Sequence, residues 1–217
     1  MEAMQEMLLE KRLLIKKSSC QELLVKAVRE ASHPCAPDAK LFQPTSVMAL
    51  LTSEEEAGLI LIQKADIDGY PWRNQMAFPG GNCDPQDVTR EDTALRELEE
   101  EMTISPKDVE IIGSIGHFQT INNKDIEAFI GIWKKKGDIC SAISEISFDP
   151  LEISRVFRIP LHYLVKVHKD KKFIGRLPGL YELTYPYEDV VIWGVTAKII
   201  HHIMEIFIPH ATRVGYI

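Results

Sequence analysis

A pair of adjacent glycines followed by an acidic helix is the feature that most constrains this chain. Gly80 and Gly81 can adopt positive φ angles and let other groups approach the backbone closely. Nine residues further on, Thr89 and Asp92 have the spacing of a capping box, and strong helix formers follow them. We therefore predict a turn at the glycines and a helix over residues 90–102.

The predicted helix has two distinct faces. At about 100° per residue, one arc collects the apolar side chains Ala94, Leu95, Leu98 and Met102. A neighbouring arc collects the carboxylates of Glu97, Glu100 and Glu101. These carboxylates repel one another by roughly 0.2–0.5 kcal/mol per pair, in a helix turn that is already negative. A bound divalent cation would reverse this penalty, whereas a solvated acidic face is the alternative interpretation.

The segment resembles the signature of the Nudix hydrolases. That signature is a glycine, five residues, an acid, and then a helix that reads Arg-Glu-apolar-x-Glu-Glu-x-Gly-apolar. Gly81 matches the glycine, Asp87 matches the acid, and the helix matches RELEEEMTI, residues 96–104. Two departures are visible: eight residues rather than seven separate Asp87 from Arg96, and Thr103 replaces the family glycine.

The departure at Thr103 keeps a second class of function open. A non-glycine residue resists the left-handed conformation that often ends a helix. The alternative hypothesis is therefore a non-catalytic, nucleotide-binding regulatory module that has kept the fold.

Other segments are similar to the coenzyme A pyrophosphatase branch of the family. They are GGNCDPQD (80–87), TALRE (93–97), VFRIPL (156–161) and VVIWGVTAKII (190–200). The upstream signature of that branch, LLTxRS followed by R-x3-G-x3-FPGG, is broken. Asn74 stands at its glycine, Tyr70 stands at its arginine, and Lys64 begins the segment that replaces its arginine-serine pair.

The resemblance implies metal-dependent hydrolysis of a pyrophosphate bond in a nucleoside diphosphate linked to another moiety. The favoured substrate is coenzyme A or an acyl-coenzyme A, which would give 3′,5′-ADP and 4′-phosphopantetheine. ADP-ribose, NADH, other dinucleotides and nucleoside triphosphates are the alternatives. Pyrophosphate oxygens repel an incoming hydroxide, so Mg²⁺ or Mn²⁺ held by clustered carboxylates suits this chemistry.

The same resemblance assigns roles to residues. The implied metal ligands are Glu97, Glu100, Glu101 and the carbonyl of Gly81. Arg96 would be catalytic by orienting the carboxylates. The general base stays open between Glu97 on the helix and Glu127 or Asp125 in a predicted loop. Substrate-binding candidates are Arg73, Trp72, Gly80 and Gly81, with Trp72 stacking on an adenine. Candidate cations for a 3′-phosphate are Lys64, Arg73, Lys124 and Arg176.

Hydrophobic periodicity predicts mixed α/β structure. Short apolar runs predict strands over residues 46–52, 59–63, 109–118 and 127–133, with a turn at 122–125. A helical period over 190–207 places Trp193 on a buried face. On that helix His201 and His202 diverge by about 100°, so we expect no shared metal and solvent exposure of at least one.

The resemblance implies the same architecture, a Nudix-type α/β/α sandwich with a mixed sheet, here with an added N-terminal helical segment. The helical pattern of residues 3–31 breaks at Ser18-Ser19, and a proline-rich linker follows it. We expect residues 1–36 to form the helical segment and linker, and residues 37–217 to form the Nudix domain.

Net charge, the length of apolar runs and the spacing of cysteines limit the kinds of partner and location that we expect for this chain. The net charge of −7 disfavours a protein that holds long nucleic acid. No apolar run reaches the roughly 18–20 residues that a membrane span needs. The cysteines are scattered without a CxxC pair, which indicates neither a zinc site nor a disulfide framework. We expect a cytoplasmic enzyme for a nucleotide-type small molecule, with a homodimer contact through the N-terminal helical segment.

Overall fold

The computed structural model describes residues 20–38, 41–53, 56–69, 72–135 and 139–217. Within them a mixed sheet contains β1 (Gln43–Thr52), β2 (Gly58–Lys64), β3 (Met76–Ala77), β4 (Gly80–Asn82), β5 (Val109–Gln119), β6 (Lys124–Trp133) and β7 (Ile153–Pro160). The strand order is β3-β2-β1-β6-β5, with β4 also paired to β1 and β7 to β2. The β1–β6 pair is parallel and the other pairs are antiparallel.

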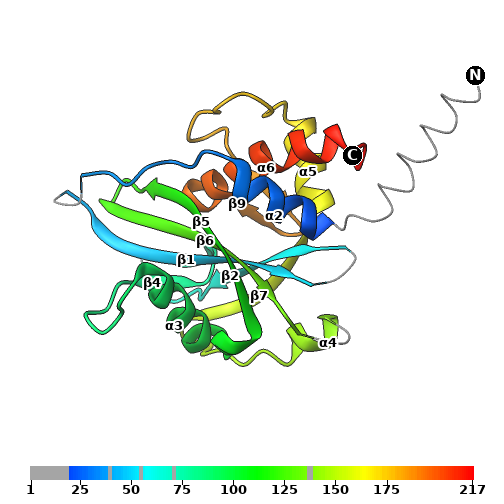
Figure 1. The fold of residues 1–217 in the computed structure, drawn as a ribbon. Helices are drawn as coiled ribbons and strands as arrows, with labels where there is room; N and C mark the ends of the chain where they lie inside the picture. The colour runs from blue at the N-terminus through cyan, green and yellow to red at the C-terminus, as the bar shows by residue number, and fades with distance from the viewer. Residues whose placement is uncertain (1–19, 39–40, 54–55, 70–71, 136–138) are drawn as a thin grey trace, which may run out of the picture.

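Helices cover both faces of this sheet (Figure 1). One face carries α3 (Arg90–Met102), followed by η1 (Pro106–Asp108), and the short α4 (Ile139–Ser144) packs into the same core cluster. The other face carries α2 (Cys20–Glu30), α5 (Leu161–Asp170) and α6 (Gly194–Arg213). The predicted α/β/α architecture with a mixed sheet and an N-terminal helix is confirmed.

Strand β1 shows why both faces need cover. Its last eight residues are all buried, as is typical of a central strand with apolar layers on both sides. Met48 and Leu50 pack with the buried face of α3, whereas Val47 and Leu51 pack with α2 and α6. The alternation fixes which side chains of β1 face the acidic helix.

The described part of the N-terminal helix, α2, starts at Cys20, and the break predicted at Ser18-Ser19 lies outside the described residues. Its apolar side, including Leu23 and Leu24, is buried in the core that contains α6. The rest of the predicted helical segment, residues 3–19, lies outside the described residues. The proposed boundary between residues 36 and 37 stays a prediction.

Strand β6 begins at Lys124, three residues earlier than predicted. Parallel pairing with β1 starts at Gln43 and Lys124 and draws the expected turn residues into the sheet. The expected turn residue Asp125 is therefore a strand residue, and so is Glu127, the first residue of the predicted strand, so neither candidate base lies in a loop.

The segment predicted as one helix over residues 190–207 is a strand followed by a longer helix. β9 (Val190–Ile192) pairs with β8 (Tyr185–Tyr187), and Gly194 at φ 68° turns the chain into α6. Trp193 lies in this turn and is 51% exposed, so its predicted burial is wrong. Among the described helices, α6 included, none is long and apolar enough to cross a membrane.

Helix α3 begins and ends as its sequence predicts. The Thr89 hydroxyl accepts from the Asp92 N–H at 3.1 Å, and the Asp92 carboxylate accepts from the Thr89 N–H at 2.9 Å, which completes the capping box. At the other end Thr103 takes the left-handed conformation, φ 53° and ψ 24°, and its N–H donates to the Glu99 carbonyl. The threonine thus ends the helix in the way expected of glycine, but with the strain of a β-branched residue.

We predict that Thr103→Gly stabilises the protein by about 0.5–1 kcal/mol. Removal of the side chain relieves left-handed strain of about 1–2 kcal/mol, and this exceeds the entropic cost of a glycine. Urea unfolding measures the change. Ser105→Gly is the matched control, because Ser105 has an ordinary φ of −66° and its replacement should destabilise. Equal destabilisation by both changes would contradict the strain argument.

Candidate active site

The prediction of a turn at Gly80 and Gly81 is wrong, because pairing with β1 makes both glycines part of the short strand β4. This glycine pair lies directly against the acidic face of α3. In the β1–β4 pair, Gly80 is opposite Val47 and Gly81 is opposite Ser46. A Cβ atom on Gly81 would overlap the carboxylate of Glu97, and one on Gly80 would overlap the backbone of β1. Gly80 requires glycine, because the β1 backbone lies so close to it and its φ is 152°. At Gly81 a side chain would displace the Glu97 carboxylate from its place beside the strand.

The three signature carboxylates lie at different depths. The side chain of Glu101 is 5% exposed, that of Glu97 is 17% exposed, and that of Glu100 is 58% exposed. Glu101 lies 2.5 Å from the Lys64 ammonium and accepts a 2.9 Å hydrogen bond from the Gly80 N–H. The structure thus brings together the predicted residues of α3 and the two glycines of β4.

Arg96 connects the outer carboxylates to the preceding loop. Its Nη1 donates to Glu97 at 2.9 Å and to Glu100 at 2.8 Å. Its Nε and Nη2 donate to the two oxygens of Asp87 at 3.0 and 3.1 Å, in a forked pair. Asp87 also accepts from the Thr93 hydroxyl at 2.7 Å. The hydrogen bonds from Arg96 hold the pKa of Asp87 well below its usual range, so the Asp87 carboxylate stays ionised.

The cluster has an excess of negative charge. Four carboxylates, counting Asp87, face the two cations Arg96 and Lys64. Burial raises the pKa of Glu97 against the effect of Arg96, and the neighbouring Glu101 and Glu100 act in the same direction. Burial also raises the pKa of Glu101 against the effect of Lys64. Each buried carboxylate would therefore gain from another positive charge.

The donor atoms around the cluster suit a hard cation. Ser46 shares the face of β1 that packs against α3, and its buried Oγ has no hydrogen-bond partner within the described residues. It lies in register with Gly81, beside the carboxylates. Carboxylate, hydroxyl and carbonyl oxygens are the ligands that Mg²⁺ and Mn²⁺ prefer. The residues present therefore fit the divalent ion that the resemblance implies.

Asp125, one candidate base, is closed off by its neighbours. It is 2% exposed and contacts Arg90 at 2.9 Å, His117 at 2.8 Å and Gln119 at 3.0 Å. Burial opposes ionisation, but the hydrogen bonds from His117 and Gln119 outweigh it and lower the pKa of Asp125. All of these contacts stabilise the charged form, so Asp125 is a structural anchor.

Glu127, the other candidate base on β6, is more exposed than Asp125, with 17% of its side chain accessible. Its carboxylate is 3.8 Å from Arg90 Nε and 3.7 Å from His117 Nε2. Glu127 is in register with Ser46, which is in register with Gly81 on the next strand. Since neighbouring strands lie about 4.8 Å apart, the Cα atoms of Glu127 and Gly81 are separated by roughly 10 Å on the face of α3.

A hollow of about 250 Å³ adjoins Gly80 and Gly81 of β4. Its lining includes Lys64, Trp72, Gly80, Gly81, Asn82, Thr120, Lys124, Val195 and Thr196. Lys124 Nζ is 5.7 Å from the centroid of the Trp72 ring and 3.1 Å from Asn82 Oδ1. The predicted Trp72 and both glycines therefore share a cavity with two lysines.

Arg73 is not part of this hollow. Its guanidinium pairs with Asp66 at 2.7 Å and Asp68 at 2.5 Å, within its own loop. Arg176, another candidate cation, pairs with Glu182. Sequence reasoning missed Ser46 altogether, because only the strand register reveals that a serine lies beside Gly81.

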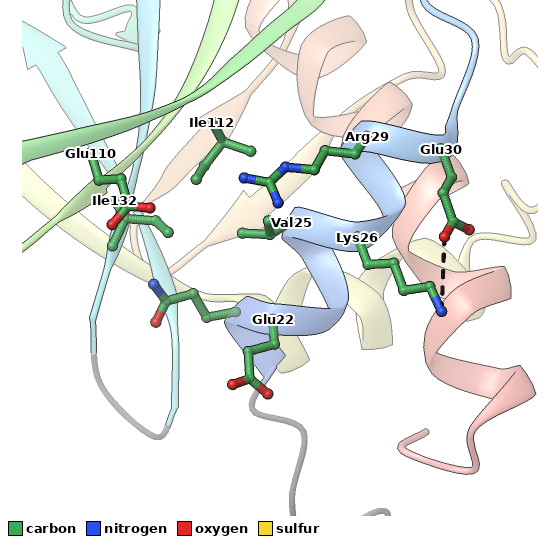
Figure 2. Close-up of a pocket in the computed structure, with 9 residues that line it drawn as sticks. Glu22, Val25, Lys26, Arg29, Glu30, Glu110, Ile112 and Ile132 are labelled. Carbon is green, nitrogen blue, oxygen red and sulfur yellow. Dashed lines mark ion pairs between the residues drawn. The ribbon is translucent and has the colours of Figure 1, made fainter.

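A larger hollow of about 510 Å³ lies between α2 and the edge strand β5 (Figure 2). Its lining carries charged side chains of both signs, and Lys26 and Glu30 form an ion pair at 3.8 Å. It belongs to the face of the sheet opposite α3. No group of carboxylates converges there, so the carboxylate cluster of α3 is the better candidate site.

An α/β/α sandwich with a glycine pair against a carboxylate-bearing helix defines a class of metal-dependent hydrolase. The family model described as NUDIX domain matches residues 42–177. The chain belongs to the Nudix hydrolase family, whose members generally use divalent ions such as Mg²⁺ or Mn²⁺. Its reaction class is therefore hydrolysis of a nucleoside diphosphate derivative.

Curated relatives include an uncharacterized Nudix hydrolase, NudL, from Yersinia pestis (strain Pestoides F). It is 29% identical over 162 residues, which cover 74% of this chain and 77% of NudL. Similar solved structures include a MutT/nudix family protein from Enterococcus faecalis, with 17% identity, a TM-score of 0.47, and coverage of 95% of this chain and 78% of that one. Another is the NUDIX domain of Shewanella oneidensis NrtR in complex with ADP ribose, with 19% identity, a TM-score of 0.43, and coverage of 60% and 82%.

We predict that Glu97→Gln stabilises the metal-free protein by about 0.5–1 kcal/mol. The amide keeps an acceptor for Arg96 but removes repulsion from two neighbouring carboxylates. Urea unfolding in EDTA and in Mg²⁺ measures both effects, since Mg²⁺ should stabilise the variant much less than the unchanged protein. Glu99→Gln, at an exposed position of the same helix, should change neither value. An undiminished Mg²⁺ effect in Glu97→Gln would exclude Glu97 from the ion site.

Proposed function

We propose that this Nudix hydrolase cleaves the pyrophosphate bond of coenzyme A or an acyl-coenzyme A. The single observation that carries the proposal is the position of the carboxylate cluster beside the hollow that contains Trp72 and Lys124. The cluster suits the phosphoanhydride, and the hollow suits an adenine with an added phosphate. ADP-ribose, NADH, other dinucleotides and nucleoside triphosphates are the alternatives within the same reaction class.

Glu97, Glu100, Glu101 and the Gly81 carbonyl would hold Mg²⁺ or Mn²⁺. When bound, the ion neutralises the pyrophosphate oxygens and activates water. Arg96 positions Glu97 and Glu100 through its two short hydrogen bonds, and Asp87 anchors Arg96 in turn. Lys64 fixes the deepest carboxylate, Glu101.

Glu97 is the proposed general base. Its Oε1 accepts from Arg96, whereas its Oε2 has no hydrogen-bond partner within the described residues. Asp125 is sealed by three partners, and Glu127 has two positively charged or ionisable neighbours. A base needs an oxygen that is free to reach water, and Glu97 meets this requirement best.

The hollow beside the cluster would hold the nucleotide. Trp72 offers a ring face for the adenine, and Lys124, close to that ring, offers a charge for the 3′-phosphate. Glu101 already engages Lys64, so Lys124 is the better phosphate partner. Direct binding of substrate by Arg73 stays a prediction. In the structure its guanidinium is paired with Asp66 and Asp68, and a substrate would have to displace these carboxylates.

A specific observation favours an acyl derivative over free coenzyme A. A second, apolar hollow of about 290 Å³ is lined by Ile121, Leu177, Pro178, Leu180, Leu183, Gly194 and Lys198. Ile121 directly follows Thr120 of the first hollow, and Gly194 directly precedes Val195 of the first hollow. The side chains of Ile121 and Leu177 are more than 80% exposed, as expected for an apolar binding surface.

The alternative of a non-catalytic module loses its main argument. It depended on Thr103 resisting the left-handed helix end, and Thr103 adopts that conformation. The family assignment and the retained carboxylates favour an enzyme. A homodimer stays a prediction, to be checked by the mass of the chain in solution.

We predict that coenzyme A with Mg²⁺ or Mn²⁺ gives 3′,5′-ADP and 4′-phosphopantetheine. Chromatography of the products over a panel of coenzyme A, ADP-ribose, NADH and nucleoside triphosphates identifies the substrate. Glu100→Gln should lower kcat on the order of 100-fold, because one oxygen donor at the charged transition state is lost. Glu127→Gln should retain far more activity than Glu97→Gln.

Glu99→Gln is the matched control for these variants and should retain full activity. Hydrolysis of no member of the panel would contradict the proposed function. Unchanged hydrolysis by Glu100→Gln would contradict the proposed metal ligands.

We further predict that octanoyl-coenzyme A has a kcat/KM roughly 10- to 100-fold above that of coenzyme A. Burial of two or three methylene groups at about 0.8 kcal/mol each produces such a ratio. Ile121→Ser combined with Leu177→Ser should remove the advantage and leave coenzyme A itself unaffected. Leu151→Ser, at a position that is 69% exposed and outside this hollow, is the control. Equal kcat/KM values for both substrates would exclude the acyl subsite.

A further inference from the structure

A second group of metal-binding side chains lies on α5 and α6, across the sheet from the carboxylates of α3. His168, His201 and Glu205 each offer one ligand atom, and these atoms all lie within 4.8 Å of one another. His168 is fully buried and His201 is 6% exposed. His201 and Glu205 are four residues apart on α6 and therefore share one face of that helix. We propose that these three side chains bind a divalent transition metal ion of the zinc type.

The hydrogen bond of His201 leaves one ring nitrogen ready to coordinate. Its Nε2 is 2.8 Å from the carbonyl oxygen of Arg176, which can only accept, so Nε2 carries the proton. The Nδ1 of the neutral ring then has a lone pair, and it has no hydrogen-bond partner in the described part of the chain. Donation of one ring N–H to a backbone carbonyl is the usual support of a metal-binding histidine.

His168 can switch between a metal-free and a metal-bound arrangement. Its Nδ1 is 2.8 Å from the Tyr185 hydroxyl, and its Nε2 is 2.9 Å from Glu205 Oε1. A hydroxyl can donate or accept. Without metal, Tyr185 donates to Nδ1 and Nε2–H donates to Glu205. With metal, Nδ1–H donates to Tyr185, and the ion replaces the single proton between Nε2 and Glu205.

The charge of the cluster favours a cation. Among the described residues, the Glu205 carboxylate contacts the His168 ring and accepts from the Gly175 N–H, at 2.9 Å for its closer oxygen, and no lysine or arginine side chain pairs with it. The nearby cations are engaged elsewhere, Arg176 by Glu182 and Lys171 by Thr184.

The donor set identifies the class of ion. Two imidazoles and one carboxylate, with a fourth position open, suit Zn²⁺ and related ions rather than Mg²⁺. The oxygen donors of α3 have the opposite preference. The two sites should therefore discriminate between ions in the same solution.

An ion at this position would be a structural link. It would join α5 to α6, and through Glu205 and His201 it would also hold Gly175 and Arg176 in place. The chain continues from there into Leu177 and Leu180 of the apolar hollow. The expectation that His201 or His202 faces solvent is wrong, because His201 is buried with His168 and His202 is half-buried, 3.0 Å from His33.

The test is zinc binding by the full chain, purified without a histidine tag, in excess Mg²⁺ that occupies the α3 site. We expect a single equivalent of Zn²⁺ in elemental analysis and titration calorimetry. At a hundredfold excess over the dissociation constant, Tm should rise by roughly 5–10 °C. Co²⁺ in place of Zn²⁺ should give the visible absorption of a site with nitrogen ligands.

Variants identify which residues bind the ion. Glu205→Gln keeps acceptors for Gly175 and His168 but should weaken Zn²⁺ binding at least tenfold, as should His201→Gln. His162→Gln, whose side chain is 59% exposed, and Glu100→Gln are controls that should bind Zn²⁺ normally. Equal binding by Glu205→Gln, or loss in Glu100→Gln, would overturn the proposal. If the variants do not fold, absence of a Zn²⁺-dependent Tm shift in the unchanged protein would overturn it as well.

Discussion

The arrangement of the site depends on packing that holds the carboxylates of α3 against Gly80 and Gly81 of β4. Repulsion within the acidic face amounts to roughly 0.2–0.5 kcal/mol per pair. Each fully buried apolar side chain on the opposite face, such as Leu98 or Met102, contributes about 1.5–3 kcal/mol. Packing against β1 therefore outweighs the repulsion, and Gly81 allows the helix to come close enough for the carboxylates to converge. Packing of the core therefore stabilises a cluster of carboxylates even when no cation is bound.

Local sequence was sufficient to predict α3, because the capping box and the two faces are both encoded between Thr89 and Met102. It was not sufficient for features that depend on strand pairing. The parallel β1–β6 register places Glu127 beside Ser46, and residues about eighty positions apart in the sequence decide it. Arg73 illustrates a different failure, since two aspartates of its own loop hold it away from the hollow. The unequal burial of Glu97, Glu100 and Glu101 depends on how close each side chain lies to the sheet. A helical wheel gives only the direction of a side chain around the helix axis, so it cannot predict this burial.

The departures from the family signature are absorbed locally. The segment with the additional residue, residues 88–95, includes the end of the loop between β4 and α3, where Asp87 accepts from the Asp84 N–H and pairs with Arg96. The loop can lengthen because only the position of the Asp87 carboxylate matters to the helix. Thr103 keeps the left-handed end of α3 at the cost of local strain, so the same carboxylates are presented as with glycine.

Specificity in this chain would come from segments outside α3. The two hollows meet where the β5–β6 turn, at Thr120 and Ile121, approaches the start of α6, at Gly194 and Val195. One hollow offers an aromatic ring and lysines, and the other offers exposed apolar side chains. A substrate that spans both needs a charged nucleotide end and an apolar end. The cluster of His168, His201 and Glu205 contacts the loop that supplies Leu177, because His201 donates to the carbonyl of Arg176. An ion in this cluster would therefore fix the shape of the apolar hollow without contact with the reacting bond.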